Sequence, residues 1–178
     1  MLRTIILLLF PLFTTAQDSL FLNSESGTSF EDLPCQIGTQ IKFSKSGTIN
    51  ALKFYKTESG STTYTLSLLN SAGIKIFATS YKNTATGWQR VLVNIPIEAG
   101  TYTLAVNNPG RYSYKKTVFP RTKGSITGMF GAFRYLETSS WTLNSTTYFV
   151  DAVISYPAIV PLSVSAVPFI PTTFPIPC

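Results

Sequence analysis

Few residue types in this chain could carry out catalysis, and their distribution excludes most catalytic mechanisms. The sequence contains no histidine, so the usual general base and the commonest metal ligand are both missing. Its two cysteines, Cys35 and Cys178, are too few and too far apart to form a zinc site. Paired carboxylates could cleave a glycosidic bond, but nothing in the spacing of the acidic residues places two of them across a cleft. We therefore expect a protein that is not an enzyme.

Aromatic side chains that stand beside arginine or asparagine are the residues that favour ligand binding. Sugar rings present flat C–H faces that pack on Tyr and Trp, while their hydroxyl groups need fixed polar partners, as ligands in pockets generally do. Residues 107–114 and 133–141 both have this composition. The alternative is packing in the core or on a sheet face, because Tyr and Phe are good strand formers. The candidate ligand-binding residues are Arg111, Tyr112, Tyr114, Arg134, Tyr135 and Trp141.

The basic residues cluster in one part of the chain. Five of the 14 Lys and Arg residues fall between Arg111 and Lys123, and the formal net charge is +6. Such a cluster could attract an acidic polysaccharide or another anionic surface. We favour the simpler interpretation, a solvated loop and a strand edge protected by lysine. Because no nucleic-acid motif is recognisable, we do not expect nucleic acid as a partner.

Asp151 is a carboxylate inside a strongly apolar run, residues 148–154. A buried carboxylate must be paired with a cation, hydrogen-bonded or bound to a metal. A structural calcium ion would need several oxygen ligands, and no second acidic residue stands nearby in the sequence. We therefore favour an ion pair with Arg134 or Arg90, or a set of backbone N–H donors, and we expect no cofactor.

Two further residues have a local interpretation. Trp88 follows Gly87 and opens a predicted strand, so we expect it to have a structural role. Asn144 begins the sequence Asn-Ser-Thr, which is a possible N-glycosylation site if the source is a eukaryote. In either case this sequence predicts an exposed loop before the last strand.

Residues 1–16 have the pattern of a secretory signal peptide. Arg3 supplies a positive start, residues 5–13 are almost wholly apolar, and residues 14–16 are the small residues of a cleavage site. The apolar run is too short to span a bilayer. We expect cleavage after Ala16, a secreted, extracellular protein and no membrane insertion afterwards. In that oxidising environment Cys35 and Cys178 could form a disulfide.

The rest of the chain divides by composition into three parts. Residues 17–31 are polar and predict a leader, in which only residues 20–22 are apolar enough to pack. Residues 32–156 form the predicted domain. Residues 157–178 are a Pro-rich apolar tail that is broken by proline too often to form a helix. The tail could dock as a terminal strand, serve as a linker or be donated to a neighbouring molecule.

Within the domain, polar and apolar residues alternate over residues 63–70, 88–95 and 101–107, as in strands with one buried face. Residues 148–154 are apolar on both faces, and residues 70–73 and 98–100 have the composition of hairpin turns. We predict an all-β protein, an antiparallel β-sandwich of jelly-roll type with little or no helix apart from the signal peptide. The residues expected to lie inside are Tyr64, Leu66, Leu68, Val91, Val93, Leu104, Val106 and Val150.

Several segments follow one another in an order that resembles a known family. They read GTINALKFYK, SLLNSAG, TATGWQRVLVNIPIEAGTYTLAV, NNPGRYSY, GAFRY and YFVDAVI. Over residues 37–154 the chain resembles a secreted bacterial family of domains of unknown function, number 4082 in that series. The resemblance implies a sandwich similar to carbohydrate-binding modules, of a kind found beside glycosidase, immunoglobulin-like or adhesion modules. The family has no established catalytic residues to carry over.

Taken together, these features predict a secreted, non-catalytic module that binds carbohydrate or other cell-surface or matrix material. The expected partner is a polysaccharide or a cell-surface glycan. The alternative is a structural subunit of an extracellular matrix or filament that self-assembles through strand exchange by the C-terminal tail.

Overall fold

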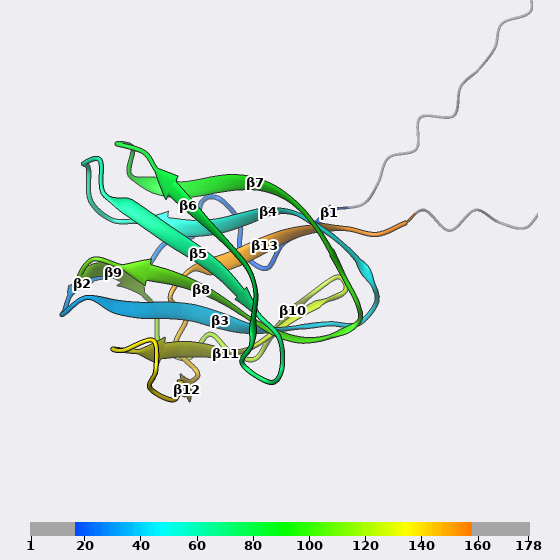
Figure 1. Ribbon diagram of the computed structural model, residues 1–178. Coiled ribbons are helices and arrows are strands. Elements are labelled where there is room, and N and C mark those ends of the chain that lie inside the picture. Colours follow the sequence, from blue (N-terminus) through cyan, green and yellow to red (C-terminus); the bar gives the residue numbers. More distant parts are fainter. Residues whose placement is uncertain (1–16, 158–178) are drawn as a thin grey trace, which may run out of the picture.

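The computed structural model describes residues 17–157 as two antiparallel sheets packed against each other (Figure 1). No helix occurs within these residues. The part of the chain described therefore contains no helix that could cross a membrane. The strands are β1 (Gln17–Asp18), β2 (Thr28–Glu31), β3 (Cys35–Phe43), β4 (Gly47–Lys56), β5 (Thr63–Leu69), β6 (Lys75–Lys82), β7 (Gly87–Ile97), β8 (Gly100–Asn108), β9 (Arg111–Tyr114), β10 (Arg121–Lys123), β11 (Ile126–Arg134), β12 (Thr142–Asn144) and β13 (Val150–Ser155).

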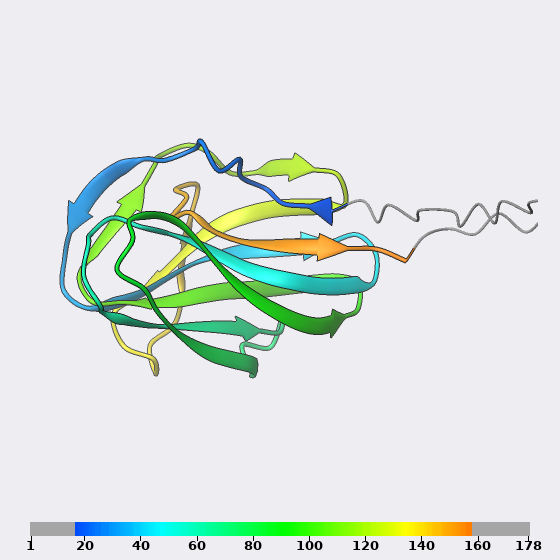
Figure 2. The ribbon, with the colours of Figure 1, turned by 90° about the horizontal axis from the view of Figure 1, so that it is seen from above.

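The two sheets differ in size. The smaller sheet has the strand order β1-β13-β4-β7, and the larger one has the order β10-β11-β3-β8-β5-β6, with β12 paired to β11. Strands β2 and β9 form a separate two-stranded sheet at one end of the molecule, which is clearest from above (Figure 2). The predicted antiparallel β-sandwich is confirmed, whereas the jelly-roll connectivity stays a prediction.

The core between the sheets consists of the residues that the alternation placed inside. Tyr64, Leu66, Leu68, Leu104, Val106 and Val150 are all buried. Val91 and Val93 are half-buried and pack against this core, because β7 is an edge strand with a neighbour on one side. Between them, Leu92 points outward and is 76% exposed. The predicted register is therefore correct for each of these strands.

Both predicted hairpin turns are present. Residues 70–74 join β5 to β6, and residues 98–99 join β7 to β8. In the first turn the side-chain oxygen of Asn70 accepts hydrogen bonds from the N–H groups of Ala72 and Ile74, both at 3.0 Å. Gly73 has a φ of 77°, a left-handed conformation that glycine adopts without strain.

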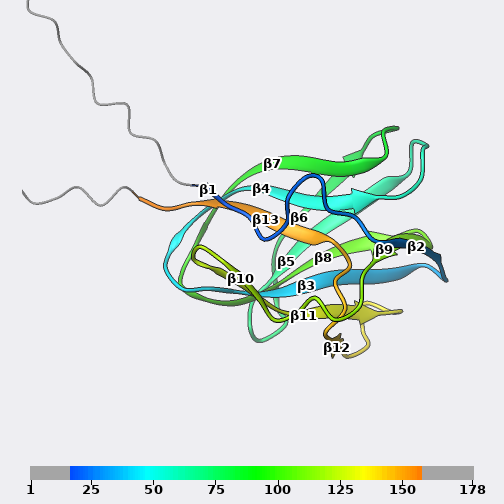
Figure 3. The same ribbon diagram turned by 180° about the vertical axis from the view of Figure 1, so that it is seen from behind.

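Residues 17–31, which we expected to be a polar leader, contribute β1 and β2 to the structure. Leu20 and Phe21 are fully buried, whereas Leu22 is exposed. After β1, the chain runs beside β13 and continues to β2 at the other end of the molecule (Figure 3). Gln17 pairs with Ser155, so the first and last described strands lie side by side.

Several sequence predictions concern residues outside those described. The signal peptide, residues 1–16, and the tail beyond Pro157 lie outside them. Cys35 is buried at the start of β3, but Cys178 lies outside the described residues. The disulfide between the two cysteines therefore stays a prediction.

Candidate functional site

The candidate site is an open groove beside the two-stranded sheet, which we call the aromatic groove. It has a volume of about 240 Å³. Two of its residues, Tyr112 and Tyr114, belong to the set predicted from the sequence. The complete lining comprises Phe30, Tyr112, Tyr114, Lys116, Thr146 and Tyr148.

Pairing between β2 and β9 brings the rings of the groove together. Phe30 lies directly opposite Tyr112, and their ring centroids are 5.7 Å apart. Tyr114 meets Phe30 edge-on, with the centroids separated by 5.9 Å and the planes at 87°. Phe30 is 46% exposed, Tyr114 is half-buried, and Tyr112 is only 6% exposed. Phe30 and Tyr114 therefore offer ring surface to a ligand, while Tyr112 supports them from beneath.

Asp32 connects the groove to a further predicted residue. The hydroxyl groups of Tyr112 and Tyr135 each lie 3.3 Å from the Asp32 carboxylate, at hydrogen-bonding distance. Burial, reinforced by the Asp32 charge, raises the pKa of Tyr112, so this phenol remains a protonated donor at neutral pH. Tyr135 also stands edge-on to Phe133, with ring centroids 4.8 Å apart, and is 52% exposed. Tyr135 therefore shares Asp32 with Tyr112 without lining the groove itself.

Arg111 does not line the aromatic groove, although it is adjacent to Tyr112 in the sequence. Successive side chains of a strand point to opposite faces, and Arg111 forms an ion pair with its cross-strand neighbour Glu31 at 2.6 Å. The hydrogen bond to Glu31 raises the pKa of Arg111. The guanidinium is therefore already engaged by a carboxylate.

The remaining two predicted residues lie together at a different place. The Arg134 guanidinium lies over the Trp141 ring, 4.2 Å from its centroid, and donates a hydrogen bond to Gln36 at 2.6 Å. Trp141 lines a separate cleft of about 200 Å³ together with Gln40 and Thr103. Gln40 and Thr103 pair across β3 and β8, and their side chains lie on the face of the sheet opposite to the buried Ile41 and Leu104. The six predicted residues therefore do not converge on one groove.

Sequence reasoning missed Phe30, Lys116, Thr146 and Tyr148 as groove residues. Phe30 stands among Ser, Thr and Glu in a segment interpreted as a leader, although Ser29, Phe30 and Glu31 do alternate as a short strand would. Tyr148 begins the run 148–154, which we predicted as one strand with two apolar faces, but β13 starts only at Val150. Tyr148 packs edge-on against Tyr112, with centroids 5.7 Å apart, and its hydroxyl accepts a hydrogen bond from Asn144 at 3.2 Å.

That hydrogen bond engages the nitrogen at which a glycan would be attached. Asn144 ends β12 and is half-buried rather than fully exposed. Its side-chain oxygen accepts a hydrogen bond from the Thr146 N–H at 2.9 Å. The nitrogen and the oxygen of the Asn144 amide are therefore both hydrogen-bonded within the turn that leads into the groove.

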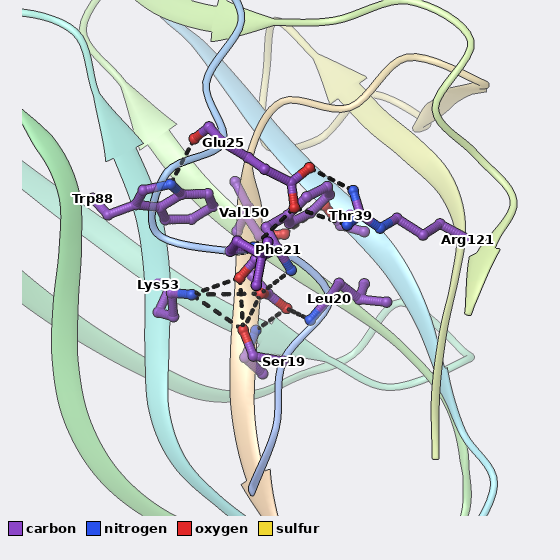
Figure 4. Close-up of polar contacts among 12 residues, drawn as sticks. Ser19, Leu20, Phe21, Glu25, Thr39, Lys53, Trp88, Arg121 and Val150 are labelled. Carbon is purple, nitrogen blue, oxygen red and sulfur yellow. Dashed lines mark hydrogen bonds and ion pairs between the residues drawn. The ribbon is translucent and has the colours of Figure 1, made fainter. Parts of the chain in front are cut away.

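A buried charged cluster lies where the N-terminal segment meets the smaller sheet (Figure 4). Asp151 is 0% exposed. Its carboxylate accepts hydrogen bonds from the Ser19 hydroxyl at 2.6 Å and from the N–H groups of Leu20 and Phe21 at 3.2 and 3.0 Å. Lys53 Nζ lies 3.8 Å away. Burial raises the pKa of Asp151 and lowers that of Lys53. The hydrogen bonds to Asp151 and the attraction between the two charges act in the opposite direction on each pKa.

The expectation of backbone N–H donors at Asp151 is thus confirmed, and the expectation of an arginine partner is wrong. The cation is Lys53, because the register of β13 and β4 places it directly opposite Asp151. Among residues 17–157 no group of three or more His, Cys, Asp or Glu residues is placed to hold a metal ion. The carboxylate oxygens instead fix the N-terminal segment to the sheet.

Trp88 and Glu25 complete this attachment. The Trp88 indole donates a hydrogen bond to the Glu25 carbonyl at 2.7 Å, and its ring stacks on Phe21 with centroids 6.0 Å apart. Arg121 binds both oxygens of the Glu25 carboxylate, at 2.6 and 2.7 Å. This hydrogen bonding holds the pKa of Glu25 below its ordinary value. Trp88 therefore has the structural role that its position after Gly87 indicated.

A comparison with protein families identifies the domain. A family model described as "Domain of unknown function (DUF4082)" matches residues 23–150. The match extends from the N-terminal segment to the first residue of β13. No curated protein matches the chain.

Proposed function

We propose that this chain, which belongs to the DUF4082 family of domains of unknown function, is a secreted, non-catalytic module that binds carbohydrate of cell surfaces or extracellular matrix in its aromatic groove. One observation carries the proposal. Phe30 and Tyr114 present partly exposed rings, nearly at right angles, in one open groove. Two such rings offer a sugar residue a surface for its C–H face.

The groove also offers polar groups at its rim. Lys116 and Thr146 both line it, and an ammonium and a hydroxyl group are suited to hydrogen bonds with sugar hydroxyl groups. Because Glu31 engages Arg111, this predicted ligand-binding arginine adds no uncompensated positive charge beside the groove. This favours a neutral glycan over an acidic one at this position.

The rings of the groove are held in place before any ligand arrives. Tyr112 contacts Phe30 from one side and Tyr148 from the other, with centroid distances of 5.7 Å in both cases. The Asn144 amide orients the Tyr148 hydroxyl in turn. A preorganised site loses little conformational freedom on binding, which leaves more of the interaction energy for affinity.

The alternative of strand exchange concerns residues 157–178, and of these only Pro157 lies within the described residues. One edge of the larger sheet, β6, has Lys75 and Lys82 at its two ends. Lysines on an edge strand oppose the addition of another strand. Carbohydrate binding is therefore the function that we put forward.

The test compares variants of the secreted chain on a panel of immobilised neutral and acidic polysaccharides. Phe30→Ala should weaken retention on the polysaccharide that binds the wild type by about 2- to 10-fold, taking aromatic-pair energies as an analogue for one stacked ring. Phe130→Ala is the matched control, because Phe130 is 40% exposed and lies outside the groove. Retention of no polysaccharide by the wild type, or equal retention of the Phe30 variant, would contradict the proposal.

A further inference from the structure

The outer face of the smaller sheet carries two cations directly opposite each other. Lys53 on β4 pairs with Arg90 on β7 in the antiparallel register, and both side chains line the same pocket. Like charges in directly opposed positions destabilise a pair of strands. Asp151, 3.8 Å from the Lys53 ammonium, compensates the charge of Lys53, so Arg90 is the cation of this pair that a ligand of opposite charge can engage.

The pocket between these cations and the N-terminal segment has a volume of about 300 Å³. Lys53 and Trp88 come from the sheet, while Gln17 and Asn23 come from the segment that Asp151 holds in place. The Trp88 ring lies 4.6 Å from Lys53 Nζ and so fixes the ammonium within the pocket. The volume is within the range of small-molecule sites.

The two cations differ in how far the protein already satisfies them. Lys53 has a side chain that is 7% exposed, and its ammonium donates to the Ser19 hydroxyl and the Phe21 carbonyl, both at 3.1 Å. Arg90 is exposed, and among residues 17–157 no ion pair or side-chain hydrogen bond engages it. Its guanidinium keeps all its donors for a ligand.

The charge around the pocket is positive overall. Burial lowers the pKa of Lys53, the Asp151 charge raises it, and Lys123 and Arg90 lower it as repelling charges. The nearby carboxylates are each paired with a cation, Asp151 with Lys53 and Glu25 with Arg121. Among residues 17–157 no ion pair engages Arg90 or Lys123, so these two charges make the surroundings of the pocket positive. A cleft lined by charges of one sign concentrates oppositely charged ligands.

We propose that this pocket is a second binding site, separate from the aromatic groove, and that it takes the carboxylate of an acidic sugar. Arg90 binds the two carboxylate oxygens through its planar guanidinium. The amides of Gln17 and Asn23, which line the same pocket, contact the sugar hydroxyl groups. The pocket is independent of the aromatic groove, because within residues 17–157 the two sites are lined by different residues.

The experiment titrates the chain with an oligogalacturonate, its neutral counterpart and a sulfated neutral oligosaccharide. The two indole N–H signals, from Trp88 and Trp141, report the location by NMR and are assigned with Trp141→Phe. The oligogalacturonate should shift the Trp88 signal but not that of Trp141. Raising the salt concentration should weaken binding, because the interaction is electrostatic.

Arg90→Gln should weaken oligogalacturonate binding by about 10-fold or more, as expected for the loss of a charge-assisted bidentate contact. Lys42→Gln, which removes the same charge from an exposed position on the other sheet, should leave it within about 2-fold. Phe30→Ala should also leave it unchanged, so failure of one site is distinguishable from failure of the other. Absence of binding, equal losses in the two charge variants, or tighter binding of the sulfated sugar would overturn the assignment.

Discussion

Lys53 places its ammonium nitrogen 3.8 Å from a carboxylate oxygen of Asp151, and their side chains are only 7% and 0% exposed. This pair lies beneath the N-terminal segment, whose Ser19 hydroxyl accepts a hydrogen bond from Lys53 and donates one to Asp151. The segment therefore covers two charges that could not remain buried without it. Residues 19–21 are part of the sandwich for this reason, despite their position in a polar stretch.

Replacing Asp151 by asparagine should strongly destabilise the fold. The change leaves the Lys53 ammonium buried without a counter-charge, and it places an amide nitrogen among N–H donors. Breaking a buried ion pair costs about 3–5 kcal/mol, which should appear in chemical denaturation. Glu137→Gln, which removes a surface ion pair with Lys75, is the control and should have little effect. Equal losses in the two variants would contradict this account of Asp151.

The ion pair between Glu25 and Arg121 should make stability depend on pH in the acid range. Hydrogen bonding to Arg121 lowers the folded-state pKa of Glu25, so the pair stabilises the protein above the unfolded pKa, about 4.3. That contribution is lost as the pH falls through the lowered folded-state pKa. Urea denaturation should show Glu25→Gln less stable than wild type by about 1 kcal/mol at pH 7. A difference that stays constant down to pH 3 would show that ionisation of Glu25 is not responsible.

Gly131 should not tolerate a side chain. A Cβ atom at this position would overlap the backbone carbonyl of Thr146, which crosses close above β11. Gly131→Ala should therefore destabilise the protein by about 1–3 kcal/mol, as overpacking does. At Gly100 the nearest atom to such a Cβ belongs to Tyr102 and is 3.6 Å away, so Gly100→Ala is the matched control. Equal melting temperatures of the two variants in thermal unfolding would contradict the close approach of Thr146 to Gly131.

In the reduced protein, Cys35 should resist alkylation. Burial raises the pKa of its thiol to about 12, and the thiolate is the reactive form. Iodoacetamide at pH 8 should label this position much more slowly in the folded chain than in urea, with Cys178→Ser used to remove the other thiol. Similar labelling rates in the folded chain and in urea would contradict the burial of this thiol. The mass of the unreduced protein tests the disulfide separately, because two free thiols would rule it out.

The strands and their buried faces were predictable from the sequence. Alternation of side chains is a local property of an extended chain, so Leu104 and Val106 could be assigned to the core without knowledge of their neighbours. The turn at residues 70–73 was predictable for the same reason, because Asn70 and Gly73 satisfy the requirements of the turn within the turn itself.

The candidate groove was predictable only in part. The composition of residues 107–114 pointed to Tyr112 and Tyr114, but the exposure of a ring depends on the strand beside it. Pairing with β2 buries Tyr112 and adds Phe30, which lies far away in the sequence. Trp141 lines another cleft and Arg134 lies over its ring, although both have the predicted composition, because composition does not specify where a segment packs.

The sequence by itself determined that Asp151, within an apolar strand, must have buried partners, since an isolated charge is too costly to remove from water. Only the tertiary structure decided that those partners are Lys53 and the N–H groups of residues 20 and 21. The choice depends on the register of β13 against β4 and on the path of the N-terminal segment. Both are long-range arrangements set by packing of the whole sandwich, and no local pattern in the chain encodes them.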